Sequence, residues 1–512
     1  MIDGKILVEK LIRYALNFLH LEKRDVIYMR NILLREFKLD EPAEEVGDLT
    51  YIDSLTVPDV LVKEIEDYAL ENKLADEYEL NLYSTYIMGI LSPLPSKVNA
   101  DFNAIKQTEG VEKACEYFYN LSIKNNYVQK TAIDKNLKWE YQDGDKFLEI
   151  TVNLSKPEKS NKDIAKLLSM PKKDKKYPAC LLCKENEGFK GTLSHPAREN
   201  IRTISLTMGG EPWFVQYSPY AYYNEHMIAI SENHTPMNVG AKTIYKLLDF
   251  VDYLPNYMVG SNASLPIVGG SILNHEHFQG GEHLMPMHKA PVKEYFTSKK
   301  YPSVKVGIVD WYNSVIRLTS KDRESIALLA GEIVESWKDF TCEECYIFAH
   351  TDGVPHNASA PVCRKSGEEY VFDIILRNNI TNEEYPDGVY HAHPEYHNIK
   401  KEGIGLIEAM GLFILPGRLK KQLADISDIL CGNVNYDKEG LAKEDHPLFV
   451  HKDMIDYLVS QGYSKTFDEA QARVTNRVNE VCKNILFNTA VFKDDSVGKS
   501  GFVKFLNSVN IF

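Results

Sequence analysis

A run of short β-prone segments that starts near residue 177 constrains the fold more than any other feature of the chain. The segments span residues 201–208, 213–217, 226–231, 306–319 and 370–378. Only a few helical patterns interrupt them, most clearly at residues 242–254 and 323–337. Strands joined by short turns favour antiparallel pairing, whereas a doubly wound sheet needs a helix between consecutive strands. We therefore predict an α+β protein with mainly antiparallel sheet.

The region before this run is predicted to be mainly helical. Leu7, Leu11 and Tyr14 follow the i, i+4, i+7 spacing of one helix face, and similar patterns continue to about residue 135. The Lys-rich stretch 155–176 contains two prolines and ends just before a Cys-x-x-Cys motif. Such a stretch is typical of a linker, so a domain boundary is expected there.

Two shorter patterns add a hairpin and a helical tail. Asp143 and Gly144 lie between two β-prone runs, which predicts a hairpin. Thr466 and Glu469 have capping-box spacing. An apolar seam follows this pattern at Val474, Val478, Val481 and Ile485. We expect this helical tail to pack on the body and assign it no chemistry.

Composition restricts the class of protein and its partners. Across 512 residues, 44% are hydrophobic and 26% are charged, which is typical of a folded chain. The net charge of −14 argues against duplex nucleic acid as a partner, although local donors can still bind a small phosphorylated ligand. Eight cysteines are too few for a disulfide scaffold, and Glu9, Lys10 and Arg13 interrupt the first apolar stretch. We expect a cytoplasmic protein without a membrane partner.

The densest functional signal is the glycine-flanked sequence at residues 260–281. It contains His275, His277 and Gln279, which would share one face if residues 271–279 form a strand. A neutral imidazole is a good nucleophile toward phosphorus, and a glutamine amide can stabilise phosphate charge without transferring a proton. The pattern favours transfer between phosphates. The alternative is a solvated strand face with incidental histidines.

A second signal is a set of metal-ligand residues. Cys180 and Cys183 have the spacing that clamps zinc in a tight turn, and His234 and His275 could complete a tetrahedral site. Zinc would then be structural and would orient the strand that carries His277. The alternative is a buried apolar turn with reduced thiols.

Other candidates are less specific. Cys342 and Cys345 form a second Cys-x-x-Cys without a nearby histidine pair. Three further histidines could hold a second metal or form a satisfied polar cluster, and that choice stays open: His356, His391 and His393. Arg202 is the best single candidate for a phosphate-binding cation.

Several of these motifs resemble one family. CLLC, YAYYNEHMIAISENHTPM and SNASLPIVGGSILNHEHFQGG are similar to segments of the hexose-1-phosphate uridylyltransferases, as are MGILSPLPSKVN, HNASAPV and GLIEAMGLFILPGRL. The resemblance is to their second, bacterial type, which has a long N-terminal extension. It implies two histidine-triad-like α+β repeats and exchange of UMP between UDP-glucose and galactose-1-phosphate by double displacement.

The resemblance also implies roles for residues and a division into domains. His277 matches the nucleophile, Gln279 matches the glutamine that steadies the uridylyl phosphate, and the Cys180–Cys183–His234–His275 set matches the zinc ligands. Asn262 and Ser271 are expected to contact the ligand. Glu276 departs from the first type, which has proline between the two histidines. The expected domains are a helical extension with linker over 1–176, a catalytic repeat over 177–300, and a second repeat with a helical tail over 301–512.

Two other functions stay open at this point. One is a histidine-triad nucleotide hydrolase or phosphorylase. Gln279 weighs against the hydrolase, because it stands in place of a third histidine. The other is a non-catalytic zinc-dependent binding module. For the leading interpretation the partners are UDP-glucose and a hexose-1-phosphate. A homodimer is one alternative for the oligomeric state.

Overall fold

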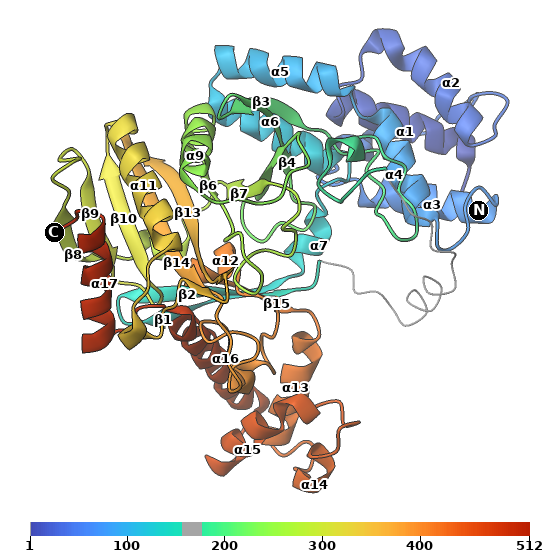
Figure 1. Cartoon of the computed structure of the whole chain (residues 1–512). Helices are drawn as coiled ribbons and strands as arrows, with labels where there is room; N and C mark the ends of the chain where they lie inside the picture. Colours follow the sequence, from blue (N-terminus) through green and yellow to red (C-terminus); the bar gives the residue numbers. More distant parts are fainter. Residues whose placement is uncertain (1, 156–176) are drawn as a thin grey trace. The chain divides into compact units, whose positions relative to one another are not determined.

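The computed structural model describes residues 2–155 and 177–512 (Figure 1). Helices and mainly antiparallel sheets confirm the α+β prediction, and β2 and β15 pair in parallel. The predicted linker at 155–176 lies outside the described residues, apart from Ser155. Within the described ranges every helix is too short or too polar to cross a bilayer.

The chain forms two compact units, each assembled from separate stretches of sequence. The first contains residues 1–135, 155–235 and 275–281, and the second contains residues 136–154, 236–274 and 282–512. The segment that carries His275, His277 and Gln279 therefore belongs to the first unit, although the chain enters the second unit on both sides of it. The division at residues 176 and 300 into an extension and two repeats stays a prediction.

The first unit begins with the predicted helices. They are α1 (Gly4–Phe18), α2 (Val26–Glu36), α3 (Asp59–Glu71), α4 (Leu80–Leu91), α5 (Pro95–Thr108), α6 (Val111–Lys124) and α7 (Lys130–Asp134), drawn in blue to cyan in Figure 1. Asp3 caps α1 by accepting from the backbone N–H groups of Lys5 and Ile6. The predicted apolar face of α1 is fully buried at Leu7 and Leu11.

An antiparallel sheet completes the first unit. Its strands are β3 (Ile204–Met208), β4 (Glu211–Tyr217), β5 (Met227–Ser231) and β7 (His277–Gly281), paired in that order. Phe278 of β7 stacks on Trp213 of β4 with ring centroids 4.9 Å apart. The strand predicted at 271–279 is wrong in its first half, since β7 begins at His277. Residues 271–276 are irregular because Glu276 bonds through both backbone groups to Thr235 and Ser231.

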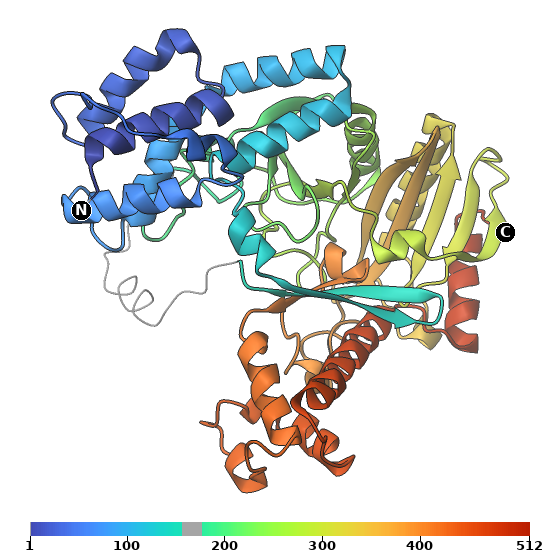
Figure 2. The same cartoon turned by 180° about the vertical axis from the view of Figure 1, so that it is seen from behind.

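The second unit contains the predicted hairpin. Strands β1 (Leu137–Asp143) and β2 (Lys146–Asn153) pair antiparallel around Gly144, whose φ is +61°. Strand β15 (Leu412–Pro416) adds to β2 in parallel (Figure 2). Other strands of this unit pair in the order β6 (Met258–Gly260), β13 (Asn357–Ser366), β14 (Glu369–Asn378), β10 (Val315–Ser320), β9 (Lys305–Val309) and β8 (Val292–Thr297). The short strands β11 (His350–Thr351) and β12 (Val354–Pro355) pair with each other.

Helices of the second unit include those predicted from the sequence. They are α9 (Ala241–Tyr253), α10 (Pro286–Lys289), α11 (Arg323–Lys338), α12 (Leu406–Ala409), α13 (Leu419–Leu430), α14 (Lys438–Leu441), α15 (Lys452–Ser460), α16 (Phe467–Thr489) and α17 (Ser496–Ser508). Thr466 caps α16, while Glu469 accepts from the N–H of Lys465 rather than from that of Thr466. The predicted seam from Val474 to Ile485 is buried.

Arg202 joins two parts of the first unit. Its buried guanidinium donates to the carbonyl of Gly89 in the last turn of α4 and to those of Ser92 and Pro93 just after it. It also donates to the carbonyls of Glu199 and Ile201. Nε and both Nη atoms take part in these five hydrogen bonds. The side chain therefore ties the turn between α4 and α5 to the segment before β3.

This arrangement predicts a stability defect. Replacing Arg202→Met leaves these carbonyls without their donor in a buried place, so the free energy of unfolding should fall by about 2–4 kcal/mol. Urea unfolding followed by circular dichroism measures this change. The exposed Arg24→Met is the matched control and should change stability by less than about 0.5 kcal/mol. Unchanged stability together with lost binding of a phosphorylated ligand would instead make Arg202 a ligand residue.

Candidate active site and metal centre

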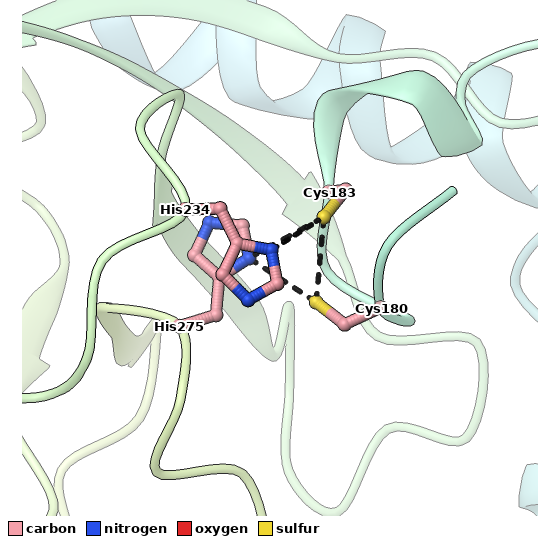
Figure 3. A group of neighbouring side chains, drawn as sticks. All are labelled: Cys180, Cys183, His234 and His275. Carbon is pink, nitrogen blue, oxygen red and sulfur yellow. Dashed lines mark hydrogen bonds between the residues drawn. The ribbon is translucent and has the colours of Figure 1, made fainter. Parts of the chain in front are cut away.

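Four predicted metal ligands meet in the first unit (Figure 3). Cys180 and Cys183 lie on one turn, His234 follows β5, and His275 precedes β7. The ligand atoms of all four lie within 4.8 Å of one another. Cys183 Sγ is 3.1 Å from His234 Nδ1, and Cys180 Sγ is 3.2 Å from His275 Nδ1. The two sulfur atoms are 3.5 Å apart.

These separations fit a tetrahedral ion. Usual Zn–S and Zn–N bond lengths require about 3.8 Å between two thiolates and about 3.6 Å between a thiolate and an imidazole nitrogen. The Nε2 of His275 donates to the carbonyl of Ser231 at 2.8 Å, which places the proton on Nε2 and the lone pair on Nδ1, facing the thiols. Burial and the neighbouring Cys180 thiol raise the pKa of Cys183 to about 11, and a bound cation reverses such a shift. The donor set is therefore suited to a metal ion.

The turn that carries the cysteines is held by hydrogen bonds. The N–H of Leu182 donates to Cys180 Sγ at 3.3 Å. The side-chain amide of Asn186 donates to the carbonyls of Cys180 and Cys183, and His195 donates to its Oδ1 at 2.7 Å. Sequence reasoning missed Asn186 and His195. The only signal for Asn186 was its position three residues after Cys183.

His277 is the first residue of β7 and is only 5% exposed. Its Nδ1 lies 2.8 Å from the carbonyl oxygen of His275. Because a carbonyl can only accept, Nδ1 carries the proton and the lone pair of the neutral ring is on Nε2. Burial lowers the pKa of His277, which favours the neutral form. The side chain is thus an oriented, neutral imidazole that keeps its lone pair on Nε2.

Gln279 projects from the same face of β7, two residues beyond His277. Its Oε1 lies 2.6 Å from Nε2 of His226, a residue that sequence reasoning missed. The intervening Phe278 points to the opposite face, toward Trp213. This part of the predicted common face is therefore confirmed by the pairing of β7 with β5, whereas His275 lies before the strand.

The residues predicted to contact the ligand are Asn262, Ser271 and Arg202, and each has a different local environment. Asn262 belongs to the second unit, where its Oδ1 accepts the N–H of Leu406 at 2.9 Å. Ser271 is exposed and also belongs to the second unit. Arg202 donates to the backbone carbonyls described above, so we do not propose it as a phosphate ligand.

The remaining candidates do not form a second metal group. His356 Nδ1 pairs with Asn379, His391 Nε2 accepts from the N–H of Ile404, and His393 Nε2 donates to the carbonyl of Val389. Cys345 Sγ lies 3.6 Å from the carbonyl of Val497. Within residues 2–155 and 177–512, the Cys180–Cys183–His234–His275 group is the one that gathers three or more metal-binding side chains.

Comparison with known proteins gives one consistent result. The family profile "Galactose-1-phosphate uridyl transferase, N-terminal domain" matches residues 21–236, and that of the C-terminal domain matches residues 250–442. Proteins named galactose-1-phosphate uridylyltransferase are similar over nearly their whole length. That of Caldanaerobacter subterraneus subsp. tengcongensis is 45% identical, covering 99% of this chain and 98% of its own. That of Fusobacterium nucleatum subsp. nucleatum is 40% identical, covering 98% of each chain.

A structural likeness is much weaker. Yeast Ap4A phosphorylase Apa2 in complex with AMP shares 11% identity and has a TM-score of 0.32, covering 68% of this chain and 96% of that chain. A score this low supports no conclusion about function. The sequence matches are decisive, since the two family profiles match residues 21–236 and 250–442 and the relatives are similar over nearly their whole length. The chain belongs to the galactose-1-phosphate uridyl transferase family.

Proposed function

We propose that this uridylyltransferase exchanges UMP between UDP-glucose and galactose-1-phosphate through a uridylyl group on His277. Its relatives are named galactose-1-phosphate uridylyltransferase. The observation that carries the proposal is the hydrogen bond between His277 Nδ1 and the carbonyl of His275, which leaves the ring lone pair on Nε2. An imidazole oriented in this way can attack phosphorus without a separate base.

The reaction then consists of two displacements at one phosphorus atom. First, Nε2 of His277 forms a bond to the α-phosphorus of UDP-glucose, and the bond from that phosphorus to the bridging oxygen breaks. Glucose-1-phosphate leaves. Next, a phosphate oxygen of galactose-1-phosphate attacks the same phosphorus, the N–P bond breaks, and UDP-galactose forms. Each leaving group is a stable anion or a neutral imidazole, so neither step needs a general acid.

Gln279 is proposed to stabilise the transferring phosphoryl group. An amide N–H can donate to a non-bridging oxygen on which charge accumulates in the transition state. An amide has no proton to transfer, which suits exchange between two phosphates better than hydrolysis. This residue is the reason to prefer exchange over the nucleotide hydrolase, and the family match is the reason to prefer it over the phosphorylase.

Zinc is proposed as the ion of the Cys180–Cys183–His234–His275 group. Two thiols and two imidazoles at tetrahedral spacing are typical of a closed structural zinc site. Bound there, zinc would fix the backbone of His275, whose carbonyl holds Nδ1 of His277. Zinc is therefore proposed to hold these residues in position and not to take part in the reaction itself.

Substrate contacts, compartment and assembly stay predictions. Sugar-nucleotide and sugar-phosphate partners follow from the family, and the net charge of −14 argues against duplex nucleic acid. Asn262 and Ser271 are still proposed to contact substrate, and the cytoplasm is still the expected compartment. The homodimer is an open alternative.

The first prediction tests the nucleophile. His277→Gly should abolish uridylylation of the protein by UDP-glucose while preserving the fold, because the deleted imidazole is the attacking group. Intact-protein mass spectrometry after incubation with UDP-glucose detects the UMP adduct. Added imidazole should restore part of the glucose-1-phosphate release. His350→Gly, at an exposed position, is the control and should keep the adduct. An adduct on the His277→Gly protein would show that another residue is the nucleophile.

The second prediction tests the metal. Purified protein should contain about one zinc per chain, and Cys180→Ser should lower zinc content and thermal stability together, because metal binding is coupled to folding. Elemental analysis and thermal unfolding measure the two effects. Cys431→Ser lies outside the metal group and should change neither. Full activity in a chelated, zinc-free protein would refute the structural role of zinc.

The third prediction tests the phosphate contact. Gln279→Ala should slow single-turnover uridylylation by roughly 10²–10³-fold, the usual cost of losing one preorganised donor to a developing oxyanion. The affinity for UDP-glucose should change much less, because the contact matters most in the transition state. Gln461→Ala, at the exposed end of α15, should leave the rate unchanged. An unchanged rate for Gln279→Ala would mean that its side chain does not contact the reacting phosphate.

A further inference from the structure

His226 is a buried histidine to which the reaction described above assigns no role. It lies just before β5, is 3% exposed, and places Nε2 at 2.6 Å from Oε1 of Gln279. Its ring packs against those of Tyr222 and Tyr223, with centroids 5.3 Å and 4.5 Å away. The Tyr223 hydroxyl donates to the carbonyl of Gly280 at 3.0 Å, so the same loop also holds the backbone beside Gln279.

The surroundings of His226 determine its tautomer. Its Nδ1 is buried and has no hydrogen-bond partner among the described residues. A proton on Nδ1 would therefore leave a buried N–H unpaired, which is rarer and more costly than an unpaired lone pair. A doubly protonated ring is also disfavoured, because burial lowers the pKa of His226 to about 4. The proton of the neutral ring is thus on Nε2, which donates to Gln279 Oε1.

That donation fixes the orientation of the Gln279 amide. With Oε1 held by His226, the NH₂ end points away from His226, and β-strand alternation puts the side chain on the same face as His277. The N–H···O bond also polarises the amide and strengthens its N–H groups as donors. If His226 is removed, the amide can rotate and present its oxygen to the phosphate instead.

We propose that His226 is a positioning residue that keeps the N–H end of the Gln279 amide toward the reacting phosphate. This inference rests on the proposed role of Gln279 in uridylyl transfer. His226 does not itself contact the substrate in this proposal, and it transfers no proton. Its contribution is to make the amide a preorganised donor in both half-reactions.

A double-mutant cycle tests the inference. His226→Phe keeps a ring packed against Tyr222 and Tyr223 but removes the donor, so single-turnover uridylylation should slow by roughly tenfold, the worth of one oriented hydrogen bond. The affinity for UDP-glucose should change by less than about threefold. In the Gln279→Ala background the same change at His226 should have no further effect on the rate, since the group through which it acts is absent.

Two conservative variants provide the matched comparison. His226→Gln can place an amide N–H close to the position of Nε2 and should recover most of the rate. His226→Asn places its amide nearer the position of Nδ1 and should stay as slow as His226→Phe. Thermal unfolding and zinc content check that each variant is folded, and the Gln–Asn comparison decides the question if His226→Phe does not fold.

The outcomes separate this inference from the proposed function. A loss of rate in Gln279→Ala, together with equal rates in the His226 variants and the unmodified enzyme, overturns the role of His226 alone. The same follows if His226→Phe slows the Gln279→Ala enzyme as much as it slows the unmodified enzyme. An unchanged rate in Gln279→Ala overturns the proposed contact with phosphate and, with it, the role of His226.

Discussion

The hydrogen bond from His277 Nδ1 to the carbonyl of His275 is the interaction on which the proposed chemistry depends. It decides which ring nitrogen keeps the lone pair. The accepting carbonyl belongs to a residue whose side chain is part of the metal group. A displacement of the His275 backbone would therefore change the position of the nucleophile. His275 of the metal group and the proposed nucleophile His277 are two residues apart in sequence, so the two sites are coupled through the backbone of His275.

The C-terminal end of β7 is held by close contact with a loop. At Gly281 φ is +151°, and a Cβ there would lie 2.7 Å from the carbonyl oxygen of Glu225 and from the Tyr223 ring. A larger residue would push away the loop that carries His226. A glycine beside such a motif can let a ligand approach the backbone, but at Gly281 the close approach is made by the protein's own loop. Short loops therefore fix β7 just before His277 and just after Gln279.

The sequence predicted the parts of this site that lie in short motifs with recognisable residue spacing. The Cys-x-x-Cys turn and the H-x-H-x-Q motif carry recognisable spacing, and four metal ligands do converge. His226 was missed because it acts through a contact with Gln279, a residue distant in sequence. Asn186 was missed although its partner Cys183 is near in sequence, because a single asparagine carries no specific signal. Such residues look like ordinary polar side chains until the pairing of strands is known. The helices and hairpin were predicted because periodicity and Asp-Gly are local signals as well.

Arg202 and the start of β7 show where predictions from local sequence patterns fail. An arginine near candidate ligands resembles a phosphate-binding residue, yet its planar set of donors is equally suited to a group of carbonyls at a helix end. Alternation of side chains suggested a strand through 271–279, but Glu276 uses its backbone groups on Thr235 and Ser231. Hydrogen-bond partners, which the sequence does not name, decided both cases.

The arrangement around β7 suits a reaction with two displacements at one phosphorus. The attacking atom is a ring nitrogen in one half-reaction and a phosphate oxygen in the other, and neither leaving group requires a proton. A site for such exchange gains little from acid–base groups and much from donors whose positions do not change between the halves. Around His277 and Gln279, the described structure places groups that orient the proposed nucleophile and the amide. These groups do not need to move protons.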